Sequence, residues 1–514
     1  MMRRHALALI LVLLVLFLHV LTFWAYTVED SYISFRYARN WATGNGLVYN
    51  VGDRVEGFSN FSWVILAGLM YRLDFDAPMV MKRAGVLLGI AAAVLMVLLA
   101  PAAASWPVRL AAPIWLAGSS AFCLWTVAGL ETPLFTFLLV LAWVLAVRCP
   151  SRRGAMSAGV VFGLAGLTRP EAPLYVLLFG AGVLCGQPSR RGLLRWVLLA
   201  LGFCMVFIPF LCFRYSYFGD IVPNTYYVKS VRFQGGGVRY LWRALPFTGV
   251  LPFLLAPFGL GRGSRAWRTG LAATVLGVVA YTLHQGGDWM PMGRFLVPVL
   301  PAVCLLGAHG LHRCAVRLER CSGGRPAARG LVAAALLFTC AWGMGSAKHN
   351  VLRWEIKLQK EWRLVGEWLR DNAPSGSAMA TGLGGIIPYH AGLTNYDNGG
   401  LTDKRIAAII RAAPNLDTER RRVDAYIMEL APRYFLIPNI IQLWDRPQLD
   451  LSALRWELLD NARFRSEYRL RNVQVAGRYF AYFEKRNGLN GGPMLTGAAA
   501  AGTGARLESA GAGG

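Results

Sequence analysis

Long runs of apolar residues, separated by short polar connections, fill the chain up to about residue 347. Runs of roughly 15–22 apolar residues are long enough for an α-helix to cross the hydrocarbon core of a bilayer. By this criterion the pattern predicts about eleven transmembrane helices. They are expected at residues 5–26, 79–100, 110–127, 132–147, 155–168, 171–186, 194–214, 246–260, 269–284, 295–311 and 329–346.

The composition agrees with this pattern. The 514 residues are 55% hydrophobic and only 16% charged, which is typical of a polytopic α-helical membrane protein. A formal net charge of +25 would suit a nucleic-acid-binding protein, but many of the basic residues lie in short connections between apolar runs. The charge is therefore a topology signal, and we expect no nucleic-acid partner.

Alternate connections are basic, which fits a cytoplasmic N-terminus under the positive-inside rule. The basic residues on this side are Arg3, Arg4, Arg109, Arg148, Arg152, Arg153, Arg190, Arg191, Arg195, Arg262, Arg265, Arg268, Arg313, Arg317, Arg320, Arg325 and Arg329. The opposite face is expected to carry the acids Glu29, Asp30, Glu56, Glu131, Glu171, Asp220 and Asp288. Acids that recur on one face predict a site at the outer surface, with the alternative that they gather there only because the inner connections are basic.

The chain is expected to divide at about residue 348, where the composition becomes charged. Residues 1–347 form the predicted transmembrane part, with a large first outer loop at 27–78. Residues 348–486 alternate helical and strand-like patterns, which predicts a small extracytoplasmic α/β domain. It is expected to contain a helix at 354–372, with Trp362, Val365, Trp368 and Leu369 on one face, and a strand at 378–381. The following run, 382–403, is rich in turn residues, and Gly382-Leu-Gly-Gly385 within it predicts a plain tight turn rather than a dinucleotide loop. The Gly/Ala-rich tail at 487–514 is expected to be disordered.

Glu29 and Asp30 are adjacent carboxylates that directly follow the first apolar run. Ionisable groups at a membrane edge are costly to desolvate and commonly have a function. A carboxylate in a cleft at this edge can take a proton from a hydroxyl or hold a divalent cation, while its neighbour tunes its charge. The nine cysteines all lie in predicted helices or inner connections, so we expect neither a disulfide framework nor a Cys-based metal site.

Several motifs resemble the GT-C-fold glycosyltransferases that use polyprenyl-phosphate sugars, and in particular the branch with the mycobacterial terminal arabinofuranosyltransferases and pilin arabinosyltransferases. The first-loop motifs are Glu29-Asp-Ser-Tyr-Ile-Ser-Phe-Arg-Tyr-Ala-Arg39, Gly44-Asn-Gly-Leu-Val-Tyr-Asn-Val-Gly52 and Arg54-Val-Glu-Gly-Phe-Ser-Asn60. The later motifs are Gly129-Leu-Glu-Thr-Pro133, Pro223-Asn-Thr-Tyr-Tyr-Val-Lys229, Gly286-Gly-Asp-Trp-Met290 with Gly293-Arg294, Trp368-Leu-Arg-Asp-Asn-Ala-Pro374 and Leu401-Thr-Asp403. The family often has Asp-Asp where this chain has Glu29-Asp30.

The resemblance implies a GT-C-like membrane fold, a polyprenyl-phosphate-linked sugar donor, and a glycan, lipid or pilin acceptor. It places the active site on the periplasmic side of the bacterial inner (plasma) membrane, with arabinofuranose as the implied sugar. Asp30 would be the general base, with Glu29 beside it, in an inverting transfer through an oxocarbenium-like transition state. Whether a divalent cation (Mg or Mn) takes part is left open. The C-terminal domain would help to bind or orient the acceptor.

The resemblance also implies that a lipid phosphate is the leaving group, and its growing negative charge would need nearby cations. The candidates are Lys229, Arg294 and Arg169, of which the first two would otherwise meet lipid headgroups and the last would pair with Glu131 and Glu171. Six residues in the matching motifs are expected to contact substrate: Arg36, Glu56, Asn60, Asn224, Asp288 and Trp289. For Asp288, stabilising the turn after two glycines is an equal alternative.

Two functions of other classes compete with transfer. A lipid or sugar transporter would need polar residues near the bilayer midplane and repeated halves, whereas the polar groups here concentrate at one face. A non-enzymatic membrane assembly factor is the other alternative, because a flagellar motor-control protein belongs to similar sequences. Loss of transfer on replacing Asp30 with asparagine would separate the enzyme from both.

Overall fold

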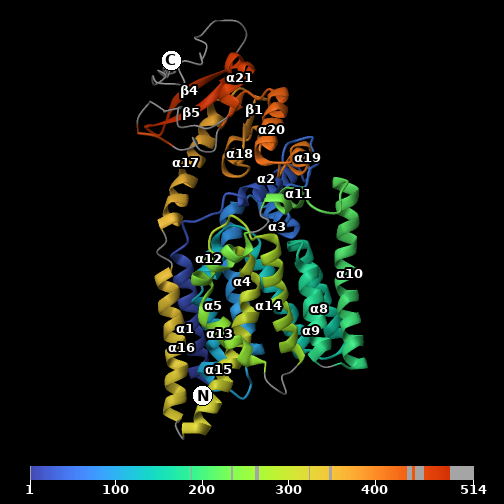
Figure 1. Cartoon of the computed structure of the whole chain (residues 1–514), viewed down its shortest axis with the longest axis vertical. Helices are drawn as coiled ribbons and strands as arrows, with labels where there is room; N and C mark the ends of the chain where they lie inside the picture. The colour runs from blue at the N-terminus through green and yellow to red at the C-terminus, as the bar shows by residue number, and fades with distance from the viewer. Residues whose placement is uncertain are drawn as a thin grey trace. The chain divides into compact units, whose positions relative to one another are not determined.

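The computed structural model describes residues 2–186, 188–232, 236–260, 266–322, 325–346, 350–436, 443–445 and 457–486 (Figure 1). The chain forms two compact units that interleave along the sequence. Unit 1 comprises Met1–Val28, Ser59–Ile221 and Arg232–Arg353, and unit 2 comprises Glu29–Phe58, Val222–Val231 and Trp354–Gly514. This division differs from a single boundary near residue 348, because much of the first outer loop packs with the C-terminal part. The tail at 487–514 lies outside the described residues.

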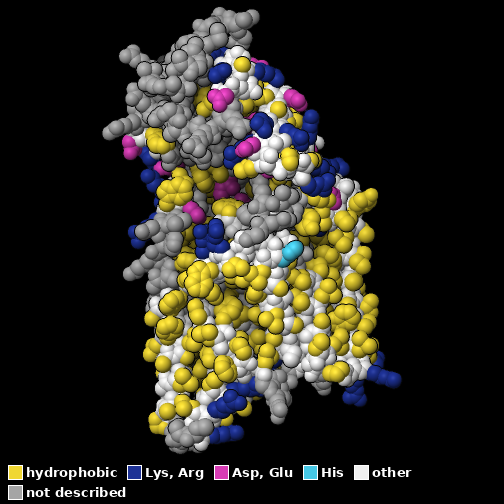
Figure 2. All heavy atoms as spheres, in the orientation of Figure 1, with side chains coloured by type: hydrophobic (Ala, Val, Ile, Leu, Met, Phe, Trp, Pro, Cys, Tyr) yellow, Lys and Arg dark blue, Asp and Glu magenta, His cyan; other side chains and the backbone are white. Residues whose placement is uncertain are grey.

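Unit 1 is a helical bundle. Its elements are α1 (Met2–Leu21), α3 (Phe61–Arg72), α4 (Ala77–Leu99), α5 (Trp106–Ala117), α6 (Ser120–Val127), α7 (Thr132–Arg148), α8 (Arg152–Thr168), α9 (Ala172–Gly186), α10 (Arg190–Phe218), α12 (Gly237–Thr248), α13 (Val250–Leu255), η1 (Ala256–Gly259), α14 (Ala266–Gln285), η2 (Arg294–Val299), α15 (Leu300–Ser322) and α16 (Arg325–Ser346). Hydrophobic side chains cover the flank of this bundle, and Lys and Arg gather at its helix ends at the bottom of the view, including the start of α10 (Figure 2).

Two expected spans are broken rather than continuous. The span at 110–127 consists of α5 and α6, which meet at 59°, and the span at 246–260 lies within α12 to η1, where the bend is 105°. Gly249 stands at the second break with φ +91°, a conformation that suits glycine. In the described part of the chain four helices are long and apolar enough to cross a membrane, or six if each bent pair is one span. The expected number of about eleven is therefore not confirmed.

Unit 2 is built on a five-stranded sheet in the order β2-β1-β3-β5-β4. β1 pairs in parallel with β2 and β3, whereas β5 pairs antiparallel with β3 and β4. The elements are α2 (Ser31–Ala42), α11 (Asn224–Arg232), α17 (Asn350–Asn372), β1 (Ala378–Thr381), α18 (Ile386–Ala391), β2 (Thr394–Asp397), α19 (Lys404–Ala412), α20 (Leu416–Leu430), β3 (Tyr434–Phe435), η5 (Glu457–Asp460), α21 (Ala462–Glu467), β4 (Tyr468–Val475) and β5 (Arg478–Lys485).

Alternate residues of the strands supply two separate cores, one on each face of the sheet. Ala380 and Phe435 belong to a core with residues of α19, α20 and α21, whereas their neighbours Met379 and Tyr434 belong to a core with residues of α17 and α18. This alternation is the period-two pattern of a strand covered on both faces. The expected helix face of Trp362, Val365, Trp368 and Leu369 packs into the second core. Helices thus pack on both faces of the sheet in unit 2. Residues 382–403 contain α18 and β2 and are more regular than the expected run of turns.

Candidate active site

The two adjacent carboxylates lie in different environments within unit 2. The Glu29 side chain is buried, and its Oε1 accepts hydrogen bonds from the backbone N–H of Gly385 and of Ile386, the latter at 3.3 Å. Burial raises the pKa of Glu29 well above its usual range, and the adjacent Asp30 charge raises it further. The Glu29 carboxylate therefore fills the glycine-rich turn between β1 and α18.

Asp30 begins α2 and is only partly buried. Its backbone φ and ψ are −56° and −23°, and its side chain makes no capping hydrogen bond. An aspartate at this position usually accepts a hydrogen bond from a backbone N–H of the first helical turn. The Asp30 carboxylate does not make this capping bond. Of the pair, Glu29 is buried and Asp30 remains partly exposed.

Arg36, on α2, is buried and holds the first outer loop to the C-terminal part of unit 2. Its guanidinium donates to the carbonyl oxygens of Tyr49 (2.8 Å), Pro388 (2.6 Å) and Leu393 (2.7 Å). It also donates to Asn50 Oδ1 at 3.1 Å. These bonds connect segments about 350 residues apart in sequence, so the residue expected to bind substrate positions the chain around Asp30.

Asn224 and Glu56 lie together in unit 2. The backbone N–H of Asn224 donates to the Glu56 carbonyl oxygen at 3.0 Å, and both side chains are buried. Asn224 Nδ2 donates to the carbonyl oxygens of Gly400 and Leu401 at 2.8 and 3.0 Å. Lys229 follows on the same short helix, α11, and is half-buried. The Pro-Asn-Thr motif therefore anchors the helix that carries Lys229.

In unit 1, Arg169 joins two acids, as the structural alternative predicted. Its Nη1 lies 2.9 Å from Glu131 Oε1, and its Nη2 and Nε lie 3.0 and 3.2 Å from the two carboxylate oxygens of Glu171. Asn60 donates from Nδ2 to the other oxygen of Glu131 at 2.8 Å. A bidentate, buried arrangement of this kind orients all of its members. Arg169 is thus engaged by carboxylates, and Asn60 is part of the same network.

Asp288 and Arg294 form a second buried pair in unit 1. Arg294 Nε lies 2.9 Å from Asp288 Oδ2, and the other oxygen of Asp288 is buried without a hydrogen-bond partner among the described residues. The Arg294 guanidinium carbon lies 5.6 Å from the centre of the Trp125 ring. The neighbouring Trp289 is 53% exposed, so it is available to a ligand.

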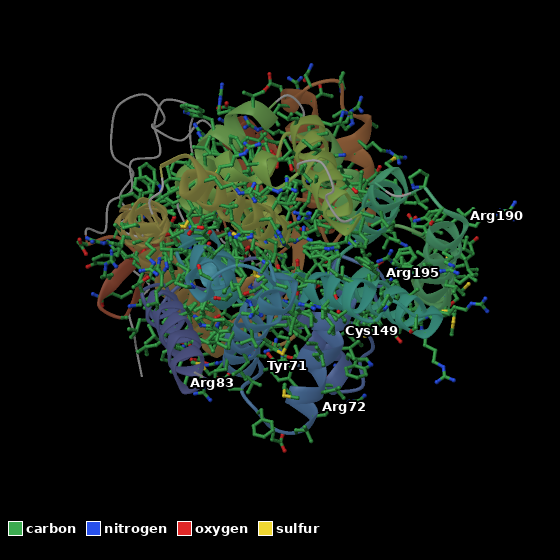
Figure 3. All side chains as sticks on the ribbon, turned by 90° about the horizontal axis from the view of Figure 1, so that it is seen from below. Tyr71, Arg72, Arg83, Cys149, Arg190 and Arg195 are labelled. Carbon is green, nitrogen blue, oxygen red and sulfur yellow. The ribbon has the colours of Figure 1, made fainter. Side chains whose placement is uncertain are left out.

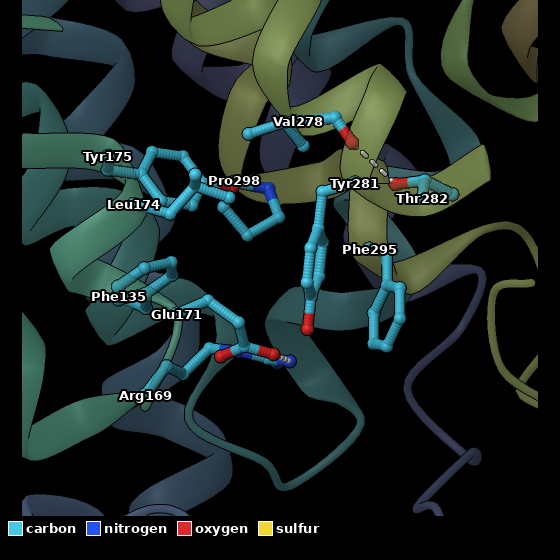
Figure 4. A pocket seen from close by; sticks show the side chains of 10 residues that line it. All are labelled: Phe135, Arg169, Glu171, Leu174, Tyr175, Val278, Tyr281, Thr282, Phe295 and Pro298. Atoms are coloured by element: carbon cyan, nitrogen blue, oxygen red, sulfur yellow. Dashed lines mark hydrogen bonds and ion pairs between the residues drawn. The ribbon is translucent and has the colours of Figure 1, made fainter. Parts of the chain in front are cut away.

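A narrow pocket in unit 1 lies beside the Arg169–Glu171 pair (Figure 4). The Tyr281 ring directs its hydroxyl toward that pair, and apolar side chains close the other sides. The cavity volume is about 20 Å³, which is room for about one water molecule. A sugar ring does not fit in this pocket.

The described residues contain no group of three His, Cys, Asp or Glu side chains arranged to hold a metal ion. One oxygen of Glu29 is taken by backbone N–H groups, so the Glu29–Asp30 pair does not fit a metal site built by the protein alone. We derive no catalytic step through a metal.

Sequence reasoning missed several residues around these side chains. The Gly385 turn was interpreted as a plain tight turn, although it binds Glu29. Trp125, beside Arg294, and Tyr240, whose hydroxyl accepts from Phe295 N–H at 3.0 Å, carry no motif that would indicate a site. Trp125 and Tyr240 are recognised as neighbours of this site only from their contacts with Arg294 and Phe295, which are distant in sequence.

Comparison with solved structures identifies the fold. The chain has the fold of the GT-C membrane glycosyltransferases. ArnT from Cupriavidus metallidurans bound to undecaprenyl phosphate matches with a TM-score of 0.63, 11% identity, and coverage of 93% of this chain and 97% of that chain. AglB, the oligosaccharyltransferase of Archaeoglobus fulgidus in complex with an inhibitory peptide and a dolichol-phosphate, matches with a TM-score of 0.58, 12% identity, and coverage of 93% and 74%.

Curated relatives narrow the resemblance. A terminal beta-(1->2)-arabinofuranosyltransferase of Mycobacterium tuberculosis is 27% identical over 337 residues, which are 55% of this chain and 52% of that protein. A protein of the same name from Corynebacterium glutamicum is 27% identical over 349 residues, 56% of this chain and 49% of that protein. The chain thus spans about half the length of the curated relatives it matches. A family model described as a domain of unknown function (DUF8728) matches residues 351–483.

The expected resemblance to GT-C glycosyltransferases and to the arabinofuranosyltransferase branch is therefore confirmed. By its fold, and by the curated relatives that it matches over about half of its length, the chain is similar to membrane glycosyltransferases.

Proposed function

We propose that the protein transfers a sugar from a polyprenyl-phosphate donor to an acceptor hydroxyl on the outer face of the inner membrane. The contrast between Asp30 and Glu29 carries this proposal. In a chain with this fold, one membrane-edge carboxylate is engaged by backbone N–H groups and the adjacent one is left accessible. An accessible carboxylate can accept the proton of an incoming alcohol.

Asp30 acts as the general base in this mechanism. As its oxygen takes the hydroxyl proton, the acceptor oxygen forms a bond to the anomeric carbon and the bond from that carbon to the phosphate oxygen breaks. The electron pair of the broken bond leaves with the lipid phosphate, and the configuration inverts because attack and departure occur on opposite faces. Glu29 positions Asp30 by holding the preceding backbone against the Gly385 turn.

Lys229 and Arg294 balance the charge that grows on the leaving phosphate. Arg169 has a different part in this proposal, because its guanidinium is already shared between Glu131 and Glu171. It stabilises the bundle around the Gly-Leu-Glu-Thr-Pro motif. Asp288, with one buried oxygen lacking a partner, accepts from a sugar hydroxyl, and Trp289 offers an exposed ring to the same ligand.

Arabinofuranose is the proposed sugar, and it rests on the curated relatives alone. The acceptor is a glycan, lipid or pilin hydroxyl, and unit 2 is proposed to orient it.

Purified protein in sealed, oriented vesicles should be incubated with a panel of radiolabelled polyprenyl-phosphate sugars and an envelope extract. We expect the arabinofuranosyl label to move only when donor and acceptor both meet the outer face. Movement of intact lipid across the bilayer without transfer of label would favour a transporter instead.

A further inference from the structure

A large cavity opens in unit 1 at the ends of α7, α8, α9, α10 and α14, away from the residues of the proposed mechanism. Its volume is about 730 Å³. Its walls include the apolar residues Val147, Phe179, Val183 and Leu199, and its polar part includes Ser189, Arg191, Arg195, Trp196 and Trp267. We call it the α10 cavity. Among the described residues, its lining contains Arg but no Asp or Glu, so it is suited to an anion.

Three buried N–H groups belong to residues that line the α10 cavity and lack an acceptor among the described residues. They are Arg195 Nε, Trp196 Nε1 and Trp267 Nε1, none of which has a hydrogen-bond partner in the described structure. A buried donor left unsatisfied is costly, because it has lost its hydrogen bonds to water without gaining another acceptor. Three such donors around one cavity therefore indicate a missing ligand with several acceptor oxygens.

Two contacts fix the positions of Arg195 and Trp196 in the cavity wall. Arg195 Nη2 donates to the carbonyl oxygen of Ala146, at the end of α7, at 2.5 Å. The indole of Trp196 lies against Gly180, where a Cβ atom would be 1.8 Å from Trp196 Nε1. Seen along the bundle, Arg195 lies inward of Arg190, which is nearer the outside (Figure 3). Its inward position agrees with its place in the lining of the α10 cavity.

We propose that the α10 cavity binds the phosphate group of an anionic membrane lipid. The two guanidinium groups of Arg191 and Arg195 meet the phosphate charge, and the Trp196 and Trp267 indoles donate to its ester oxygens. An acyl chain continues along the apolar wall. A lipid suits this cavity better than free phosphate because polar and apolar walls adjoin, and because α10 is itself a candidate membrane span.

Native mass spectrometry of the detergent-purified protein tests this directly. Phosphatidylglycerol, phosphatidylcholine and inorganic phosphate are titrated separately, and bound fractions are compared. We expect phosphatidylglycerol to bind at least tenfold more tightly than phosphatidylcholine. Equal binding of the two lipids would overturn the proposal, and displacement of phosphatidylglycerol by millimolar phosphate would assign the site to a soluble phosphate compound instead.

Variants locate the site. Arg195→Gln and Trp196→Phe should each weaken phosphatidylglycerol binding, with Trp196→Phe keeping the ring and removing only the N–H donor. Arg190→Gln is the matched control, because it removes the same charge from the same helix end outside the cavity lining. Equal losses in Arg190→Gln and Arg195→Gln would reduce the effect to general surface charge and contradict the proposal. If Arg195→Gln does not fold, Trp196→Phe decides the outcome alone.

Discussion

The Glu29 carboxylate accepts hydrogen bonds from the backbone N–H groups of Gly385 and Ile386, which lie more than 350 residues away in sequence. Gly385 ends a glycine-rich turn between a strand and a short helix, and this is a local geometry that commonly receives phosphate. Here an internal carboxylate fills it. The bond fixes the residue next to Asp30, so it links the fold of unit 2 to the proposed chemistry.

Replacing Glu29 should reveal this positioning role. Glu29→Gln keeps an acceptor oxygen for Gly385 and should retain most of the stability, whereas Glu29→Ala leaves two buried N–H groups unsatisfied. We expect Glu29→Ala to destabilise unit 2 by about 1–3 kcal/mol. Unfolding in detergent, followed by limited proteolysis of unit 2, measures the difference. Equal stability of the two variants would show that the hydrogen bonds contribute little.

Asp397 should make the stability of unit 2 depend on pH. Burial raises the pKa of Asp397 from its usual 3.8 to about 6, against the opposing effect of the Thr402 and Gly399 N–H groups. Because the folded-state pKa is the higher one, folding favours the protonated form. The stabilisation is full below pH 3.8 and is lost as pH rises through about 6.

The size of this effect is about 3 kcal/mol for a shift of roughly two pKa units. Unfolding at pH 4.5 and 7.5 should therefore differ for the native protein. Asp397→Asn should reduce this difference without removing it, because the buried Glu29, whose pKa is also raised, still titrates. An unchanged pH slope in Asp397→Asn would assign the dependence to another group.

Arg169 should matter for stability more than for donor binding. Arg169→Gln leaves the Glu131 and Glu171 carboxylates buried without their shared cation, and such a loss costs about 3–5 kcal/mol. Arg169→Lys should rescue only part of it, since an ammonium cannot bind both oxygens of Glu171 in the same plane. The exposed pair Arg363–Glu367 provides the control, because Arg363→Gln should change stability by less than about 1 kcal/mol. Thermal unfolding measures the stability of Arg169→Gln, Arg169→Lys and Arg363→Gln against the native protein.

A stable Arg169→Gln protein with weak donor binding would contradict this prediction and would instead make Arg169 a phosphate ligand.

Lys229 should act on the donor. Lys229→Gln removes one cation proposed to face the lipid phosphate, and we expect the apparent affinity for donor to fall about tenfold, or roughly 1.4 kcal/mol. Lys357→Gln is the control, because it removes the same charge from an exposed lysine outside the proposed site. The Lys357 side chain is 65% exposed, and its Nζ makes only a long ion pair of 3.9 Å with Glu361. Donor titration at saturating acceptor measures both. Equal effects of the two substitutions would mean that Lys229 contributes only general charge.

The sequence predicts elements whose pattern is local and periodic. Strand β1 matches 378–381 because its neighbouring turns are marked by glycine and proline, and the apolar face of α17 was recognised from its helical spacing. The break at Gly249 was missed because hydropathy averages over a bend. The grouping of Glu29–Phe58 with the C-terminal part depends on Arg36 and Glu29 contacting the backbone of residues 385–393, and no local pattern encodes those partners.

The candidate site also has features that the sequence predicts and features that depend on long-range contacts. Its chemical residue types are visible in the motifs, and Glu131, Arg169 and Glu171 were paired from their positions alone. The distinct environments of Glu29 and Asp30 were not predictable, because two adjacent carboxylates are equivalent in sequence. The burial of Glu29 and its hydrogen bonds from Gly385 and Ile386 distinguish them.

Transfer by the Asp30→Asn protein tests the central claim most directly. The variant is compared with native protein and with Asp53→Asn, which removes another carboxylate from the same segment, using radiolabelled polyprenyl-phosphate arabinose and envelope acceptor. The account predicts that Asp30→Asn loses about 10²–10⁴-fold in turnover, while donor binding and folding persist and Asp53→Asn transfers normally. Turnover of Asp30→Asn at the native rate would contradict it.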